Sequence, residues 1–308
     1  MILVFGGNGQ LGQELSRAAA AHSIAMHALS HAKADIADGA AVAAALARWE
    51  PDLVVNAAAY TKVDLAETNV EDARRGNETG PAMLAAACAG AGVPLVHVST
   101  DYVFDGEKAE PYVETDPIRP LSAYGRSKAA GEDAVRCVLK RHVILRTAWV
   151  YSEFGQNFLK TILRLASSRD ELRIVADQRG SPTSAQEIAA AILHIAPQLA
   201  REGAWGTYHF TASGDTTWHG FAERAVAAAA PFTGRRPVVR PISTAEYPTP
   251  AKRPANSRLD CRLFMRTFDY SPRPWAECVD ATTRALVAAP QPAASQTMTN
   301  NTGTNHVA

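Results

Sequence analysis

The sequence predicts an α/β protein with a Rossmann-type, doubly wound parallel sheet and a smaller, discontinuous C-terminal lobe. Three observations predict this fold: a glycine loop directly after the first apolar run, strands alternating with helices to about residue 150, and a looser pattern after Tyr151. Alternating strands and helices favour a parallel sheet with helices on both faces. Ligands of such sheets bind at the carboxyl ends of the strands.

The first strand and its glycine loop open the chain. Residues 1–5 are a short apolar run typical of a buried strand, and Gly-Gly-Asn-Gly-Gln-Leu-Gly at residues 6–12 leads into a predicted helix over residues 10–21. Gly6 would permit the tight turn, Gly9 would let the backbone approach a pyrophosphate, and Gly12 would allow close helix–strand packing. The spacing is Gly-x-x-Gly-x-x-Gly rather than Gly-x-Gly-x-x-Gly. Its place between strand and helix nevertheless predicts nucleotide binding.

The remaining elements follow in order. Strands are predicted over residues 24–29, 53–59, 94–99 and 143–150, and helices over 39–49, 69–90 and 122–139. Beyond Tyr151 the pattern predicts helices over 157–167 and 183–199, a strand over 173–177, and a proline-rich stretch over 205–270 with short strands and one helix near 216–229. We expect an NAD(P)-binding domain over 1–150 and a mainly substrate-binding lobe over 151–288, with some segments returning to the first domain. Residues 289–308 lack apolar periodicity and are predicted to be a disordered tail.

A hydroxyl, a phenol and an ammonium mark the candidate chemistry. Thr100 follows the strand predicted to end at Ser99, and Tyr124 and Lys128 are four residues apart in a predicted helix. This spacing puts both side chains on one helix face, where an ammonium would favour the phenolate and lower a pKa that is about 10 when unperturbed. A tyrosine tuned in this way can act as a general acid toward a carbonyl oxygen.

Composition limits the partners and the compartment. The chain has 308 residues, 47% hydrophobic and 20% charged, with 31 basic and 31 acidic side chains and a formal net charge of zero, so nothing favours nucleic acid or an anionic membrane. The sequence contains no apolar run of about 18 residues and no leader, which predicts a cytoplasmic protein. The four cysteines are far apart and are expected to be reduced thiols, and the nine histidines show no metal-ligand spacing.

Six segments, taken together, resemble the extended short-chain dehydrogenases/reductases, and more narrowly the dTDP-4-dehydrorhamnose reductases. These segments are the glycine loop, Asn56-Ala-Ala-Ala-Tyr-Thr-Lys-Val-Asp64, Ser99-Thr-Asp-Tyr-Val-Phe-Asp-Gly106, Tyr124-Gly-Arg-Ser-Lys128, Arg146-Thr-Ala-Trp-Val-Tyr151 and Arg253-Pro-Ala-Asn-Ser-Arg-Leu259. The resemblance covers roughly residues 1–286. It implies hydride transfer from NADPH or NADH to C4 of dTDP-4-dehydro-β-L-rhamnose, giving dTDP-L-rhamnose for cell-surface polysaccharide of the O-antigen type.

The resemblance also implies roles for individual residues. Thr100, Tyr124 and Lys128 would be catalytic, with Thr100 bonded to the carbonyl oxygen, Tyr124 as proton donor, and Lys128 on the nicotinamide ribose. The sugar would be bordered by Val63, Thr100, Asp101, Tyr124 and Trp149. The residues implied to bind the cofactor are Gly6, Asn8, Gly9, Gln10, Leu11, Gly12, Asp35, Ile36, Ala57, Ala58, Ala59, Tyr124 and Lys128.

Two departures from the family pattern leave questions open. The second strand ends in Ala-Leu-Ser-His at residues 28–31, with neither the acid that binds the ribose of NAD nor an arginine suited to NADP, so the preferred cofactor stays open. Gln186 stands where some relatives place a glutamate that bridges a dimer through magnesium. We therefore expect no metal, and a metal-linked homodimer is doubtful.

Two other functions compete with the reductase. One is a nucleotide-sugar 4,6-dehydratase or epimerase of the same superfamily, which Tyr102 argues against, because dehydratases typically carry an acid right after the Thr-Asp pair. The other is a regulatory subunit that binds NAD(P) without catalysis, which the intact Thr100, Tyr124 and Lys128 argue against.

Overall fold

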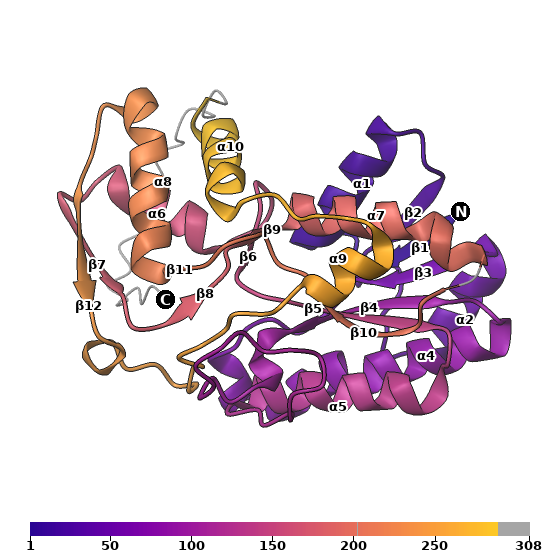
Figure 1. Ribbon diagram of the computed structural model, residues 1–308. Helices are drawn as coiled ribbons and strands as arrows, with labels where there is room; N and C mark the ends of the chain where they lie inside the picture. Colours follow the sequence, from indigo (N-terminus) through magenta and orange to yellow (C-terminus); the bar gives the residue numbers. More distant parts are fainter. Residues whose placement is uncertain (202, 289–308) are drawn as a thin grey trace.

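A parallel six-stranded sheet forms the centre of the larger part of the molecule, seen in a computed structural model that describes residues 1–201 and 203–288 (Figure 1). Its strands lie in the order β10-β5-β4-β3-β1-β2, and every neighbouring pair is parallel. The strands are β1 (Ile2–Phe5), β2 (Met26–Leu29), β3 (Leu53–Asn56), β4 (Leu95–Thr100), β5 (His142–Thr147) and β10 (Gly206–His209). The predicted Rossmann-type sheet is confirmed.

Helices cover both faces of this sheet. Helices α1 (Gln10–Ala21) and α7 (Ala185–Arg201) pack on one face, and α2 (Gly39–Trp49), α4 (Gly80–Ala91) and α5 (Ala123–Val138) pack on the other. Strand β1 shows why: Ile2 and Val4 point into one core and Leu3 and Phe5 into the other. A strand buried on both faces therefore reads as a continuous apolar run.

A smaller lobe lies beside the carboxyl ends of the strands, at the left of Figure 1. Its core joins Leu159 and Ile162 of α6 (Phe158–Ala166), Phe221 of α8 (Trp218–Thr233) and Val279 of α10 (Trp275–Ala288). Its strands pair two by two: β7 (Glu171–Val175) with β12 (Val238–Ile242), β8 (Arg179–Gly180) with β11 (Thr216–Thr217), and β6 (Val150–Tyr151) with β9 (Thr183–Ser184).

Segments from the second half of the chain return to the large sheet. Strand β10 extends it beyond β5, α7 packs against α1, and α9 (Arg262–Phe268) adds Phe264 and Phe268 to the same core. The second half therefore contributes to both parts of the molecule. The predicted tail over 289–308 lies outside the described residues.

The helix predicted over residues 69–90 is divided into three segments. These are α3 (Val70–Arg74), a π-helical turn over Arg75–Thr79, and α4. The side chain of Asn77 bonds the backbone N–H and carbonyl of Tyr60 at 2.9 and 3.0 Å and the Ser127 hydroxyl at 3.0 Å. A π turn inserts one extra residue, and here it lets Asn77 tie the helix to the loop after β3.

The strand predicted over 143–150 is also interrupted. Strand β5 ends at Thr147 and β6 begins at Val150, because Trp149 between them has a left-handed backbone with φ of 50°. Its ring stacks on that of Trp218 with centroids 3.7 Å apart. The predicted strand over 53–59 ends early too, at Asn56, whose side-chain oxygen accepts a bond from Ala58 N–H at 3.0 Å. Two short 3-10 turns, Leu65–Glu67 and Asp101–Val103, follow β3 and β4, and a third, Thr244–Glu246, follows β12.

Candidate active site

A cleft of about 950 Å³ opens at the carboxyl ends of the parallel strands. It lies where the strand order reverses, since β1 has β2 on one side and β3 on the other, which is where ligands of open α/β sheets bind. Nearly all of the residues predicted for the site line it: Gly6, Asn8, Gly9, Gln10, Leu11, Asp35, Ile36, Ala57, Ala58, Ala59, Val63, Thr100, Asp101, Tyr124, Lys128 and Trp149.

Gly12 is the exception among the predicted residues. A Cβ atom there would lie 2.3 Å from the carbonyl oxygen of Gly6 and 2.7 Å from Cα of Gly7. Gly12 therefore allows helix α1 to pack against the loop, and it does not line the cleft.

The glycine loop provides a cradle that fits a dinucleotide. Gly6 has φ of 89°, and a Cβ there would lie 2.5 Å from the backbone nitrogen of Ala58. The loops after β1 and β3 therefore pack backbone against backbone here, with no room for a side chain at Gly6. Gly9, the N-cap of α1, makes no side-chain cap bond, and Gly9, Gln10 and Leu11 line the cleft. The free N–H groups of the first helical turn would therefore be donors for a phosphate bound there.

A loop from the smaller lobe closes over the start of α1. Asn157 donates to the side-chain oxygen of Gln10 at 2.9 Å, Ser152 donates to buried Glu14 at 2.6 Å, and Arg17 pairs with Glu153 at 2.7 Å. These three contacts position residues 152–157 beside the glycine loop, where Gly155, Gln156 and Asn157 also line the cleft.

The three predicted catalytic side chains come from two neighbouring elements. Thr100 ends β4, and Tyr124 and Lys128 are one turn apart on α5, which Ser122 caps by accepting from the N–H of Gly125 at 3.1 Å. The nitrogen of Lys128 donates to the carbonyl oxygen of Val98 in β4 at 2.7 Å. Thr100 also caps the next turn, since its hydroxyl accepts from Tyr102 N–H at 3.2 Å and donates to Asp101 at 3.0 Å.

The acidity of Tyr124 differs from the prediction. Burial raises the pKa of the Tyr124 phenol, although its hydrogen bond with Thr100 acts against this. Burial lowers the pKa of Lys128 to about 8, against the opposing influence of the Glu132 carboxylate. The expected lowering of the Tyr124 pKa is therefore wrong for the protein alone, because desolvation of the buried ring dominates and the nearby Asp101 also raises the pKa.

The wall on the sugar side combines acid and aromatic groups. Asp101 is buried, and burial raises its pKa to about 6, with hydrogen bonds from Ser257 and Thr100 acting in the opposite direction. Tyr102 packs edge-on against Tyr124, with centroids 5.4 Å apart, and accepts a bond from Arg253 at 3.1 Å. The stacked rings of Trp149 and Trp218 form the side of the cleft that belongs to the smaller lobe.

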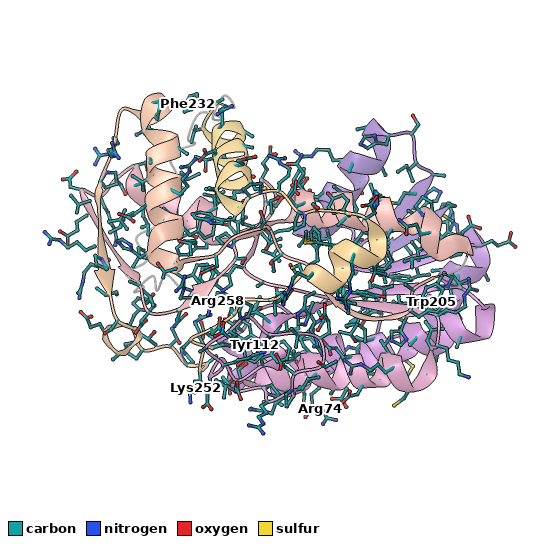
Figure 2. The ribbon with its side chains drawn as sticks, viewed as in Figure 1. Arg74, Tyr112, Trp205, Phe232, Lys252 and Arg258 are labelled. Carbon is teal, nitrogen blue, oxygen red and sulfur yellow. The ribbon has the colours of Figure 1, made fainter. Side chains whose placement is uncertain are left out.

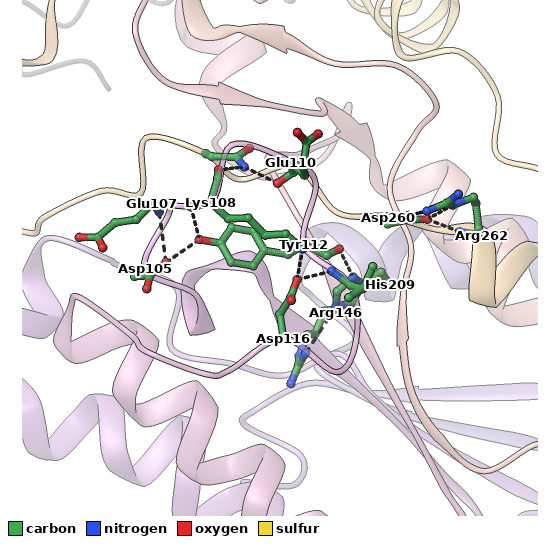
Figure 3. A network of polar contacts seen from close by, with 12 residues as sticks. Asp105, Glu107, Lys108, Glu110, Tyr112, Asp116, Arg146, His209, Asp260 and Arg262 are labelled. Carbon is green, nitrogen blue, oxygen red and sulfur yellow. Dashed lines mark hydrogen bonds and ion pairs between the residues drawn. The ribbon is translucent and has the colours of Figure 1, made fainter.

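A buried ion pair fixes α5 against β5. Arg146 donates to both oxygens of Glu132 at 2.9 and 2.7 Å, and both side chains are buried. Figure 3 shows Arg146 beside His209, whose ring bonds the carbonyl of Tyr112 at 3.0 Å. The guanidinium also lies over the ring of Phe104, 5.1 Å from its centroid. One side chain thus connects the helix that carries Tyr124 with the segments that carry Thr100 and Trp149.

Several residues at the cleft were missed by sequence reasoning. His31, Tyr60, Thr61, Asp72, Arg75, Asn157, Trp218 and Arg253 line it as well. Tyr60, Thr61 and Arg253 lie in segments that carry the family resemblance, and His31 lies at the end of the predicted second strand. Asn157 begins the helix predicted over 157–167. Asp72, Arg75 and Trp218 reach the cleft from segments whose patterns give no signal of a site.

No metal centre is visible in the part of the chain that the structure describes, where no three His, Cys, Asp or Glu side chains group as possible ligands. Gln186 is exposed, and the adjacent Glu187 is buried and pairs with Arg273 at 3.4 Å. Across residues 1–201 and 203–288, none of the helices is both long and apolar enough to cross a membrane.

The fold and the lining of the cleft define an NAD(P)-dependent oxidoreductase of the Rossmann type. The RmlD substrate binding domain family matches residues 1–287. Similar curated proteins include the dTDP-4-dehydrorhamnose reductases of Sinorhizobium fredii, 45% identical over 93% of this chain and 96% of the relative, and of Escherichia coli K12, 42% identical over 87% and 91%. The chain belongs to the dTDP-4-dehydrorhamnose reductase family.

Solved structures agree with this assignment. A reductase of this name from Clostridium acetobutylicum superposes with a TM-score of 0.85 at 37% identity, covering 92% of this chain and 99% of the other. The Bacillus anthracis reductase, solved in complex with NADP, gives 0.84 at 32% identity, covering 91% and 97%.

Proposed function

We propose that this protein reduces the C4 keto group of dTDP-4-dehydro-β-L-rhamnose with NADPH or NADH, giving dTDP-L-rhamnose for cell-surface polysaccharide. The observation that carries the proposal is the meeting of Thr100, Tyr124 and Lys128 with the glycine loop in one cleft, in a chain of this family. A bound nicotinamide supplies the hydride to the C4 carbon.

The side chains supply the proton and the orientation. Tyr124 donates its phenolic proton to the C4 oxygen as negative charge develops there, and a raised pKa keeps the phenol protonated and ready to donate. The Thr100 hydroxyl bonds the same oxygen and so aligns the carbonyl. Lys128 holds the nicotinamide ribose and, as an ammonium, favours the phenolate that remains on Tyr124.

The remaining residues hold the two ligands. The backbone of Gly6, Asn8, Gly9, Gln10 and Leu11 cradles the pyrophosphate, and Ala57, Ala58 and Ala59 leave room for the dinucleotide to pass the end of β3. Asp35 and Ile36 border the adenosine. Val63, Asp101 and Trp149 border the sugar.

The test is a turnover assay with defined products. The protein should oxidise one NADPH for each dTDP-4-dehydro-β-L-rhamnose, and NMR should identify dTDP-L-rhamnose. The C4 epimer, a 6-deoxy-L-talose, would contradict the stereochemical part of the proposal. Binding of NADPH with no turnover of the keto sugar would favour the non-catalytic subunit instead.

The proposal extends to assembly and location. We place the enzyme in the cytoplasm, in keeping with the four cysteines, which are free thiols here; fractionation of the cells checks this. It needs no divalent ion, so activity should survive exhaustive EDTA treatment. A homodimer, if light scattering detects one, should keep its mass in EDTA.

A further inference from the structure

We propose that Arg75 is the residue through which this enzyme accepts the 2′-phosphate of NADPH. The inference deepens the proposed function and rests on it for the direction in which the dinucleotide lies in the cleft. The end of β2 lacks a basic residue for the 2′-phosphate, and the guanidinium of Arg75 would supply that positive charge from another segment.

The place of the adenosine ribose follows from the fold. In doubly wound dinucleotide sites the residue at the end of the second strand reads the ribose 2′ position. Here β2 ends at Leu29, whose carbonyl oxygen accepts bonds from the N–H groups of Gly6 and Gly7 at 3.0 and 2.8 Å. The segment after β2 therefore runs beside the glycine loop, and it brings His31 and Asp35 into the lining of the cleft.

Arg75 enters the same corner from the π turn after α3. Its Nη2 donates to Asp35 at 2.5 Å, and Asp35 uses its other oxygen to accept from the N–H of Ala37 at 2.9 Å. Among the residues that the structure describes, no hydrogen bond occupies Nε or Nη1 of Arg75. A planar guanidinium can thus keep Asp35 on one edge while it offers N–H donors to a phosphate on another.

The local charges make Arg75 decisive. Asp72 and Asp35 both line this corner. Burial acts to raise the pKa of Asp35, but the hydrogen bonds from Arg75 and from the Ala37 N–H outweigh it and lower the pKa overall. Asp35 is therefore a carboxylate at neutral pH. Without Arg75 the corner would carry the two carboxylates of Asp35 and Asp72, and a phosphate dianion would be repelled. With Arg75 partly neutralised by Asp35, NADPH and NADH should both serve, with kcat/KM values within about a hundredfold.

The experiment compares Arg75→Gln with Arg74→Gln as a matched control. Arg74 is the preceding residue, is absent from the lining of the cleft, and pairs with Glu71 and Glu78 on the outer side of the helix, at the lower edge of Figure 2. Fluorescence titration gives the dissociation constants of NADPH and NADH. Calorimetry gives those of adenosine 2′,5′-bisphosphate and adenosine 5′-phosphate, which differ only in the phosphate at issue.

The expected results distinguish the loss of the Arg75 charge at the 2′-phosphate from a general disturbance of the cofactor site. Arg75→Gln should weaken NADPH and the bisphosphate at least about tenfold and change NADH and the monophosphate less than about threefold. Arg74→Gln should change none of the four. Asp72→Asn should tighten NADPH relative to NADH, and Arg75→Lys should retain more NADPH affinity than Arg75→Gln.

Equal weakening of NADPH and NADH by Arg75→Gln would overturn the proposal, as would an equal effect of Arg74→Gln. Because the Arg75 side chain is 62% exposed, the variants should fold, and unchanged NADH binding verifies this. No keto sugar is present in these titrations, so a wrong sugar assignment in the proposed function would leave their outcome unaffected.

Discussion

The ammonium nitrogen of Lys128 lies 2.7 Å from the carbonyl oxygen of Val98, so the lysine that shares a helix face with Tyr124 is fixed to the strand that ends in Thr100. This bond connects β4 and α5, the two elements that carry the proposed catalytic groups. It also leaves the ammonium two further N–H donors for a ribose.

Tyr124→Phe should lower kcat at least about a hundredfold, because it removes the proton donor and almost no volume. The dissociation constant of NADPH should stay close to that of the unchanged protein, since the ring remains. Stopped-flow turnover and fluorescence titration measure the two quantities. Turnover near the original rate would remove Tyr124 from the mechanism.

Activity should depend on the charge of Lys128. Its pKa of about 8 means that Lys128 is an ammonium below pH 8 and loses its proton as the pH rises through that value. The raised pKa of Tyr124 keeps the phenol protonated over the same range. We therefore expect kcat/KM for NADPH, which reports the free enzyme, to be highest below about pH 8 and to fall above it. A flat profile from neutral to strongly alkaline pH would show that the ammonium is not required.

Gly12→Ala should abolish tight cofactor binding and destabilise the fold by about 1–3 kcal/mol, because the new methyl group would meet the backbone of Gly6 and Gly7. The matched control is Gly90→Ala, in α4, where nothing lies within 4 Å of the added atom. That variant should be as stable as the original or up to about 1 kcal/mol more stable. Urea unfolding measures both, and equal effects of the two substitutions would be evidence against the packing role of Gly12.

Breaking the ion pair between Arg146 and Glu132 should cost about 3–5 kcal/mol of unfolding free energy, since Glu132→Gln leaves a buried guanidinium uncompensated. The double change Glu132→Leu with Arg146→Met removes both charges and should be much less destabilised than the single variant. Urea unfolding of the original protein, the single variant and the double variant measures the three unfolding free energies. A single variant within about 1 kcal/mol of the original would mean that the pair does not hold α5 against β5.

Local patterns were sufficient to predict most of the fold. Strand β1, its glycine loop and α1 follow from a few consecutive residues, and the spacing of Tyr124 and Lys128 placed both on one helix. The interruptions were not predictable in this way. Trp149 leaves the strand to stack on Trp218, 69 residues later, and Arg75–Thr79 forms a π turn so that Asn77 can reach Tyr60 and Ser127.

The candidate site likewise contains residues that local patterns predict and residues that only the folded chain brings together. Residues on the strand ends and the first loop could be predicted, because their positions follow from the order of strands. The position of Arg75 could not be predicted, because its partner Asp35 is 40 residues away in the sequence and only folding brings the two side chains together. The direction of the Tyr124 pKa was mispredicted for a related reason: the spacing reveals the neighbouring charge but not the burial of the ring.

The most direct test of the central claim is the fate of an isotope carried by the cofactor. NADPH with deuterium at both C4 positions of its nicotinamide is mixed with the enzyme and dTDP-4-dehydro-β-L-rhamnose, and the product is examined by NMR and mass spectrometry. We predict one deuterium per molecule, at C4 of the dTDP-L-rhamnose formed. A product without deuterium, or with deuterium at another carbon of the sugar, would contradict direct reduction of the C4 carbonyl in this cleft.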